Sequence, residues 1–208
     1  MPDSLPVDFY FDPACRWAWW ASIWIRRVAR ERPISISWKL FSLAVQDNPD
    51  DYRQPPARAH HIKDFDLQRV LVVARRLGGN AAVDRLFVAL GNVLHGSRED
   101  IWDVRIQARC LEAAGLPTNL FDVALRDPNT EAAVVAETQA ALALGALGTP
   151  SIAISGADNC LLGSIIGRVP SGEDALQLWD HVYFALTQPY VYEMKRSRKS
   201  APDVQFAD

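Results

Sequence analysis

A single cysteine, Cys15, stands where an apolar segment ends and a helical pattern begins. The mostly apolar residues 7–11 stop at Asp12-Pro13, and Arg16 opens a stretch without a helix breaker. A thiol at a helix start lies near unpaired backbone N–H groups and the positive end of the helix dipole, and both favour the thiolate. We therefore expect Cys15 to be a nucleophile with a pKa below the ordinary thiol value of about 8.5.

The chain lacks the partner that would make Cys15 half of a dithiol site. A second thiol three residues later would resolve a mixed disulfide, but the residue there is Ala18. Cys110 falls in a helical pattern and Cys160 in a strand pattern, where we expect small buried hydrophobic side chains. Any turnover is then monothiol: Cys15 forms a mixed disulfide with a small thiol, and a second small thiol releases it.

The residues around Cys15 predict a strand, a helix and a second strand. Residues 6–11 have strand character, and residues 34–40 alternate apolar and polar side chains. Between them, residues 16–32 carry a stripe of apolar side chains at helical spacing, namely Trp17, Trp20, Trp24 and Val28, before Pro33 ends the helix. Such a unit predicts two parallel strands joined by a right-handed crossover.

The rest of the chain divides into a helical block and a short strand pair. Residues 46–56 predict a loop, and only helical signals follow from about residue 57 to residue 145, with Ser97 and Asp127 as expected helix N-caps. Residues 151–155 predict a strand, residues 156–159 a turn and residues 160–162 the return strand. A last helix is expected over residues 175–186.

This order of elements resembles the thioredoxin-like α/β fold with an all-helical domain inserted between its two halves, as in DsbA-like proteins. We expect a discontinuous thioredoxin-like domain over residues 1–56 and 146–194, an inserted helical domain over 57–145 and a C-terminal tail over 195–208. In this plan a loop with a cis-proline meets the cysteine. Thr149-Pro150 stands at that place, where its main chain would lie beside the thiol and pair with a bound thiol substrate.

Within the DsbA-like branch, the chain resembles the mycothiol-dependent nitroreductases. The matching stretches run in order over nearly the whole chain: residues 12–19, 41–45, 51–53, 91–95, 113–117, 148–150, 169–173 and 178–180. The family pattern at the active site is Cys-Pro-Trp-Cys, whereas this chain has Cys15-Arg16-Trp17-Ala18. The proline and the resolving cysteine are therefore both missing.

Other residues are candidates for binding a thiol or substrate. A fixed charge on Arg16 would favour a neighbouring thiolate, and Trp17 could stack on an aromatic substrate, although Arg16 could equally face solvent and Trp17 belong to the buried stripe. Asn48, Tyr52, Arg53 and His95 complete the set. The first three could hydrogen-bond a sugar-bearing thiol or belong to a solvated loop, and His95 could instead be a core or capping histidine.

Composition excludes several classes of partner. The net charge of −3 and the lack of a basic run in the body of the chain argue against binding to nucleic acid. No apolar stretch approaches the ~20 residues of a membrane span, and we expect no secretory signal before the first apolar segment. Three sparse cysteines indicate a reduced, cytoplasmic protein. We find no metal-ligand spacing and no phosphate-binding loop, and so expect no metal and no tightly bound cofactor.

These observations predict a thiol-dependent oxidoreductase. It would use mycothiol or a similar low-molecular-weight thiol as cosubstrate to reduce mixed disulfides or electrophilic and nitroaromatic compounds. One alternative is a thiol transferase or isomerase like the kappa-type glutathione transferases, in which the protein residue activates the small thiol without forming a disulfide. The other is a non-catalytic ligand-binding protein that has lost the redox pair.

Overall fold

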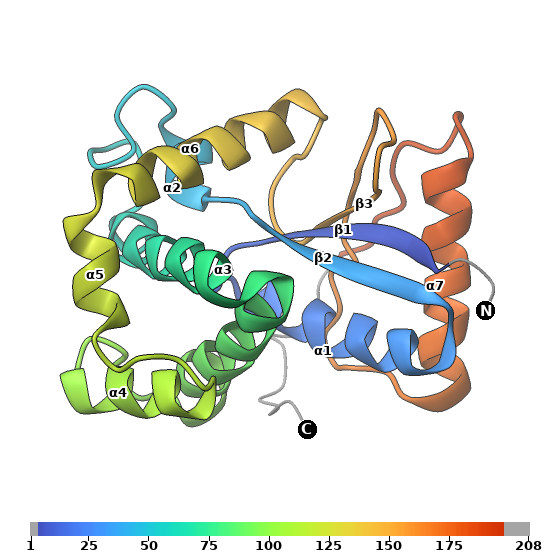
Figure 1. Cartoon of the computed structure of the whole chain (residues 1–208). Coiled ribbons are helices and arrows are strands. Elements are labelled where there is room, and N and C mark those ends of the chain that lie inside the picture. The colour runs from blue at the N-terminus through green and yellow to red at the C-terminus, as the bar shows by residue number, and fades with distance from the viewer. Residues whose placement is uncertain (1–3, 198–208) are drawn as a thin grey trace.

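A four-stranded sheet lies at the centre of the computed structural model, which describes residues 4–197 (Figure 1). The strands β1 (Leu5–Phe11), β2 (Ile34–Leu40), β3 (Ser151–Ile154) and β4 (Leu161–Leu162) stand in the order β2-β1-β3-β4. β1 runs parallel to β2 and antiparallel to β3, and β3 runs antiparallel to β4. The sequence therefore predicted the parallel pair and the later hairpin correctly.

Helix α1 (Arg16–Glu31) makes the crossover between β1 and β2 and packs on the last helix, α7 (Gly172–Thr187). The indole N–H of Trp24 donates to the backbone carbonyl of Ala175 at 2.9 Å, and the ring of Trp179 lies 6.5 Å from that of Trp24. This bond gives the buried indole N–H an acceptor and helps to fix where α7 begins against α1.

Between β2 and β3 the chain forms helices, which gather on the left of Figure 1 near the ends of β1 and β2. They are α2 (Leu43–Asp47), α3 (Ala59–Gly91), the π-helical turn η1 (Asn92–Ser97), α4 (Val104–Ala113), α5 (Leu120–Arg126) and α6 (Pro128–Ala143). α3 is kinked at Gly78 and Gly79, where Gly79 has a φ of 62°. The helical character predicted for this stretch is confirmed, and the two glycines, which have backbone freedom that other residues lack, explain the kink.

Asp127 caps α6 as the sequence predicts. Its side chain accepts a hydrogen bond from the backbone N–H of Asn129 at 2.9 Å, and Pro128 takes the first helical position. Proline loses nothing there, because the N–H at that position has no partner inside a helix.

The predicted N-cap at Ser97 is wrong. Ser97 ends η1, and Arg98 after it has a left-handed backbone with a φ of 57°. Helix α4 begins only at Val104, and Asp103 caps it by accepting a backbone hydrogen bond at 2.8 Å. The Ser97 hydroxyl donates instead to the carboxylate of Glu99 at 2.6 Å, so it does not open a helix.

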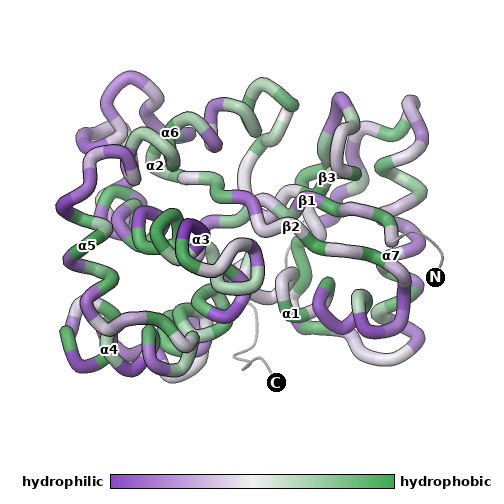
Figure 2. The backbone as a smooth tube through the Cα atoms, in the orientation of Figure 1, coloured by the Kyte–Doolittle hydropathy of each residue, from purple (hydrophilic) through white to green (hydrophobic). Residues whose placement is uncertain are grey.

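The helices and the sheet share one aromatic core. Phe87 of α3 stacks on Phe11 of β1 with ring centroids 4.0 Å apart, and it meets Trp19 of α1 edge-on at 5.8 Å. The backbone tube in Figure 2 mixes hydrophobic and hydrophilic residues along the strands and is mostly hydrophilic in the outer loop after α2. Burial of these large rings holds the helices between β2 and β3 against the sheet.

Two predicted element boundaries differ from those in the structure. Cys160 lies just before β4 rather than inside it, and α7 starts at Gly172, earlier than predicted. Of the predicted tail 195–208, residues 195–197 form neither helix nor strand, and residues 198–208 lie outside the described residues. Within residues 4–197, no helix combines the length and hydrophobicity needed to cross a membrane.

Candidate functional site

Cys15 is the N-cap residue of α1. Its backbone is extended, with φ of −75° and ψ of 110°, and its N–H donates to the carbonyl of Asp12 at 2.9 Å. This turn aims the side chain at the first turn of the helix, where the backbone N–H groups of Trp17 and Ala18 interact with the sulfur. The sequence placed the thiol at the correct end of the correct helix.

The thiol lies against the loop that leads into β3. The Cys15 Sγ donates to the backbone carbonyl of Thr149 at 3.4 Å, although 134 residues separate the two in sequence. The Thr149–Pro150 peptide bond is cis. The Thr149 side chain is 7 % exposed, and its Oγ1 has no hydrogen-bond partner among the described residues. A buried hydroxyl without a partner can donate to a thiolate, which lowers the pKa of Cys15.

The expectation of a depressed thiol pKa is wrong. Cys15 is only 9 % exposed, and burial raises its pKa above the ordinary value because the thiolate would lose its hydration. Hydrogen bonds from Thr149 and from the helix backbone act in the opposite direction, and the nearby Asp12 carboxylate adds to the rise. In the resting protein, Cys15 is therefore a buried thiol rather than a thiolate.

Asp12 is a site residue that the sequence analysis missed. Its side chain is buried beneath the Cys15 turn and accepts from the N–H of Ala14 at 3.0 Å, from the N–H of Leu43 at 3.1 Å and from the Gln68 amide at 3.0 Å. Burial raises the pKa of Asp12 to about 7. No local pattern in the sequence marked this residue, because its partner Gln68 lies 56 residues away among other polar side chains, Asp66 and Arg69.

His95 supports the same turn from η1. Its Nε2 lies 2.9 Å from the carbonyl oxygen of Pro13, and because a carbonyl only accepts, Nε2 carries the proton. Burial lowers the pKa of His95 to about 4, so the ring is neutral near pH 7. The contact places His95 behind the cysteine turn.

Arg16 and Trp17 follow Cys15 on the first turn of α1. Arg16 is exposed, and Trp17 is half-buried against the edge of the hydrophobic core. Both remain candidates for contact with a bound molecule, because each keeps part of its side chain at the surface beside the thiol.

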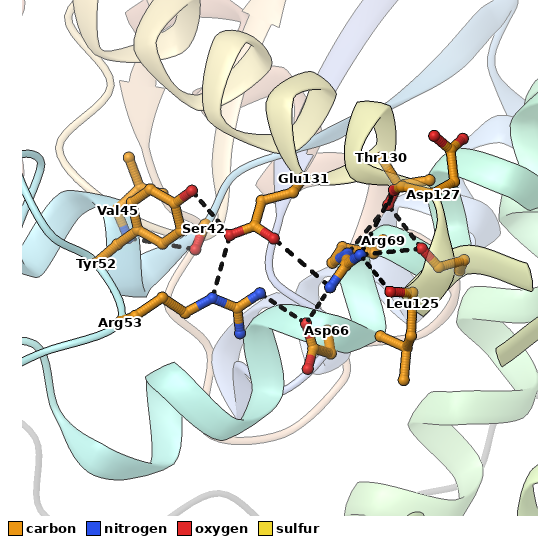
Figure 3. Close-up of polar contacts among 11 residues, drawn as sticks. Ser42, Val45, Tyr52, Arg53, Asp66, Arg69, Leu125, Asp127, Thr130 and Glu131 are labelled. Atoms are coloured by element: carbon orange, nitrogen blue, oxygen red, sulfur yellow. Dashed lines mark hydrogen bonds and ion pairs between the residues drawn. The ribbon is translucent and has the colours of Figure 1, made fainter. Parts of the chain in front are cut away.

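Two of the candidates from the loop after α2, Tyr52 and Arg53, lie in a polar cluster with α3 and α6 (Figure 3). The Tyr52 hydroxyl donates to Glu131 at 2.9 Å, and Arg53 pairs with Glu131 at 3.2 Å and with Asp66 at 2.9 Å. Asn48 donates to three backbone carbonyls of its own loop. The structure thus brings Tyr52 and Arg53 together at Glu131 and leaves Asn48 bonded within its own loop, so each of the three helps to hold the loop.

The two other cysteines are set apart from this chemistry. Cys110 is 2 % exposed and Cys160 half-buried, and burial raises the pKa of each to about 11. All three cysteines are free thiols. Among residues 4–197, no three histidine, cysteine or carboxylate side chains converge in a way that could hold a metal ion.

Comparison with known families decides the relationship. A family model described as "Rv2466c-like: Mycothiol-dependent nitroreductase Rv2466c" matches residues 14–196. The chain belongs to this family. Its match begins one residue before Cys15 and extends past α7, so it includes the thiol, the Thr149–Pro150 loop and all the helices between them.

A curated mycobacterial protein is also similar to this chain. "Uncharacterized protein Rv2286c" of Mycobacterium tuberculosis (strain ATCC 25618 / H37Rv) is 34 % identical over 199 residues, covering 96 % of this chain and 84 % of the relative. The similarity therefore extends over almost the whole of this chain.

Solved structures share the fold at low identity. The probable DsbA oxidoreductase SCO1869 from Streptomyces coelicolor has a TM-score of 0.60 at 16 % identity, covering 97 % of this chain and 99 % of that one. The cytosolic disulfide reductase DsbM from Pseudomonas aeruginosa has a TM-score of 0.60 at 11 % identity, covering 85 % and 98 %. This member of the nitroreductase family therefore has the DsbA-like form of the thioredoxin fold.

Proposed function

We propose that this protein is a monothiol member of its family, with Cys15 as the only redox-active residue. The proposal is carried by one observation: the Cys15 sulfur faces Thr149 beside the cis-proline loop, while Ala18 occupies the position of a second thiol. The Cys15 thiolate would attack one sulfur of a disulfide and release the other half as a thiolate. A second small thiol would then attack the mixed disulfide, leave with the bound half as a new disulfide, and restore Cys15.

The small thiol in this proposal is mycothiol or a close chemical relative. The family model that matches this chain is described as mycothiol-dependent, which supports this choice. We assign direct contact to Arg16 and Trp17 and main-chain pairing to Thr149 and Pro150. Asn48, Tyr52, Arg53 and His95 would contribute by holding the loop and the cysteine turn in place.

Several finer features belong to the same proposal. The substrates would be mixed disulfides or electrophilic and nitroaromatic compounds, with electrons supplied by two molecules of the small thiol that leave as a disulfide. No cofactor would stay bound between turnovers, and the protein would work in the cytoplasm. Residues 57–145 would form the inserted helical domain of a discontinuous thioredoxin-like domain.

The test is intact-mass spectrometry after incubation with oxidised mycothiol and, separately, with oxidised glutathione. We expect one mycothiol adduct on the wild type, removed by reduced mycothiol, and the same adduct on Cys160→Ser as the matched control. Cys15→Ser should carry none. A folded wild type that forms no adduct with either disulfide would overturn the proposal.

A second function is favoured by the raised pKa of Cys15. A thiol that keeps its proton can donate a hydrogen bond to the thiolate of a bound small thiol, as in the transferase and isomerase alternative. Under that function, Cys15→Ser would retain much of its thiol-transfer activity, because serine also donates a hydrogen bond. Under the monothiol redox function, the same substitution would abolish turnover.

A further inference from the structure

The side chain of Asp12 links the cysteine turn to two other elements. One carboxylate oxygen accepts from the N–H of Ala14 inside the turn. The other accepts from the N–H of Leu43 at the start of α2 and from the Gln68 amide of α3. A 2 % exposed carboxyl group with three donors holds these segments at fixed distances from Cys15.

Gln68 is an unusual partner for such a carboxyl group. It is completely buried, its Nε2 faces Asp12 at 3.0 Å, and its Oε1 has no hydrogen-bond partner among the described residues. An amide can turn over to present either a donor or an acceptor. Gln68 can therefore donate to an ionised Asp12 and, after rotation, accept from a protonated one.

The charge of Asp12 acts directly on Cys15. The two groups lie in the same turn, and the interaction of the carboxylate with the sulfur opposes formation of the thiolate. Like charges repel more strongly where water is excluded, as it is at both of these buried groups. Protonation of Asp12 removes the repulsion, and deprotonation restores it.

We propose that Asp12 is a positioning residue whose ionisation switches the reactivity of Cys15: the neutral carboxyl group favours the thiolate, and the carboxylate suppresses it. The inference rests on Cys15 being the reactive thiol of the proposed function. It assigns Gln68 a role as well, as the side chain that accommodates both states of Asp12. Among the described residues, the ionisable groups near Asp12 and Gln68 come from three elements. They are Cys15 at the start of α1, Asp64 with its neighbours His60 and Lys63 on α3, and His95 on η1 behind Pro13.

The test is the rate at which 2,2′-dithiodipyridine modifies Cys15 in the intact protein, measured between about pH 5.5 and pH 9, with peptide mapping to assign the modified residue. Asp12→Asn is compared with the wild type, both in a Cys160→Ser background. Because Asp12 in the wild type is protonated well below its pKa of about 7, the two rates should agree there. Above that pKa, Asp12→Asn should react about threefold faster, since it lacks the suppressing charge.

The ratio of the Asp12→Asn rate to the wild-type rate, measured as a function of pH, distinguishes this proposal from a structural role. A ratio that rises from one to a plateau with a midpoint near pH 7 supports the switch. A ratio that is the same at every pH, including one far from unity, overturns it, because a purely structural defect does not titrate. Absence of modification of Cys15 at every pH would instead refute the proposed function.

A second variant keeps the proposal testable where Asp12→Asn does not fold. Gln68→Met removes the amide that donates to the carboxylate, and so raises the pKa of Asp12 further. Its rate should equal that of the wild type at both ends of the pH range and exceed it in between. A flat ratio for Gln68→Met also overturns the proposal.

Discussion

Burial controls the charge of the side chains around the cysteine. Desolvation raises the pKa of Cys15 and Asp12 and lowers that of His95, and in each case the uncharged form gains. The helix N-terminus and the Thr149 hydroxyl act against this trend at Cys15 without reversing it. Helix position alone was therefore a poor guide to the thiol, because it ignored how little water reaches the sulfur.

Replacing Ala18 by cysteine should convert the site into a dithiol. The backbone N–H of Ala18 already interacts with the Cys15 sulfur, so a thiol on that residue would lie close enough to attack a mixed disulfide at Cys15. We expect oxidised Ala18→Cys to carry no mycothiol adduct. Its intact mass should instead be lower by two hydrogen atoms, as for a disulfide between residues 15 and 18. Ala18→Ser is the matched control and should keep the adduct. An adduct that persists on Ala18→Cys would contradict the monothiol explanation.

His95 should make folding stability depend on pH. Its folded pKa of about 4 lies below the unfolded value of about 6.5, so the unfolded chain binds more protons between those values. Its contribution is complete above about pH 6.5 and is lost as the pH falls toward 4. Asp12 changes the stability in the opposite direction, because its folded pKa of about 7 is raised and its protonation on lowering the pH favours the folded state. In the wild type alone, Asp12 would therefore mask part of the loss of stability caused by His95.

The comparison that isolates this effect is His95→Gln, whose amide can still donate to Pro13. From about pH 7 to about pH 4.5, the free energy of unfolding of the wild type should fall relative to the variant by about 2 to 3 kcal/mol. Urea denaturation at several pH values measures it. A difference that stays constant with pH would show that His95 is not held neutral in the fold.

At the scale of elements, α1 shows what the sequence could and could not predict. Of the predicted stripe, Trp20, Trp24 and Val28 are buried and Trp17 is half-buried, but Trp19 is buried too. A 3.6-residue period describes a helix with one covered face, whereas α1 is covered by the sheet and α7 and also meets Phe87 of α3 through Trp19. Contacts made by segments far along the chain were beyond local periodicity, and the same is true of the Asp12–Gln68 bond.

The cluster around Glu131 should keep the loop after α2 closed. Glu131→Ala removes the acceptor of Tyr52 and one of the two carboxylate partners of Arg53, so the loop should open more often. We expect trypsin to cleave after Arg53 and Arg58 about tenfold faster, as for a loss of ~1.4 kcal/mol in local stability. Glu112→Ala, at an exposed position of α4, is the control and should be cleaved like the wild type. Equal cleavage of both variants would exclude the cluster as the loop's anchor.

At the scale of the whole molecule, the order of elements and the family resemblance predicted the architecture, and the family match supports it. What they could not supply is how closely the end of α3 approaches α1. That distance depends on Gly91 at the end of α3, where a Cβ atom would lie 2.1 Å from the Trp19 ring. Glycine is needed there because the indole of α1 occupies the space of any larger side chain.

Gly91→Ala should therefore weaken the packing of α3 against α1. The added methyl group must displace a completely buried indole, and overpacking of this kind costs typically about 1–3 kcal/mol, so we expect a loss near the upper end. Urea denaturation measures the loss, and Gly167→Ala, where a Cβ meets nothing within 4 Å, is the matched control. Trp19 and Cys15 both belong to the start of α1, so displacement of Trp19 should make Cys15 more accessible. We therefore expect 2,2′-dithiodipyridine to modify Cys15 faster in Gly91→Ala than in the wild type. A variant as stable as Gly167→Ala would mean that α1 and α3 can separate without loss, contrary to a single shared core.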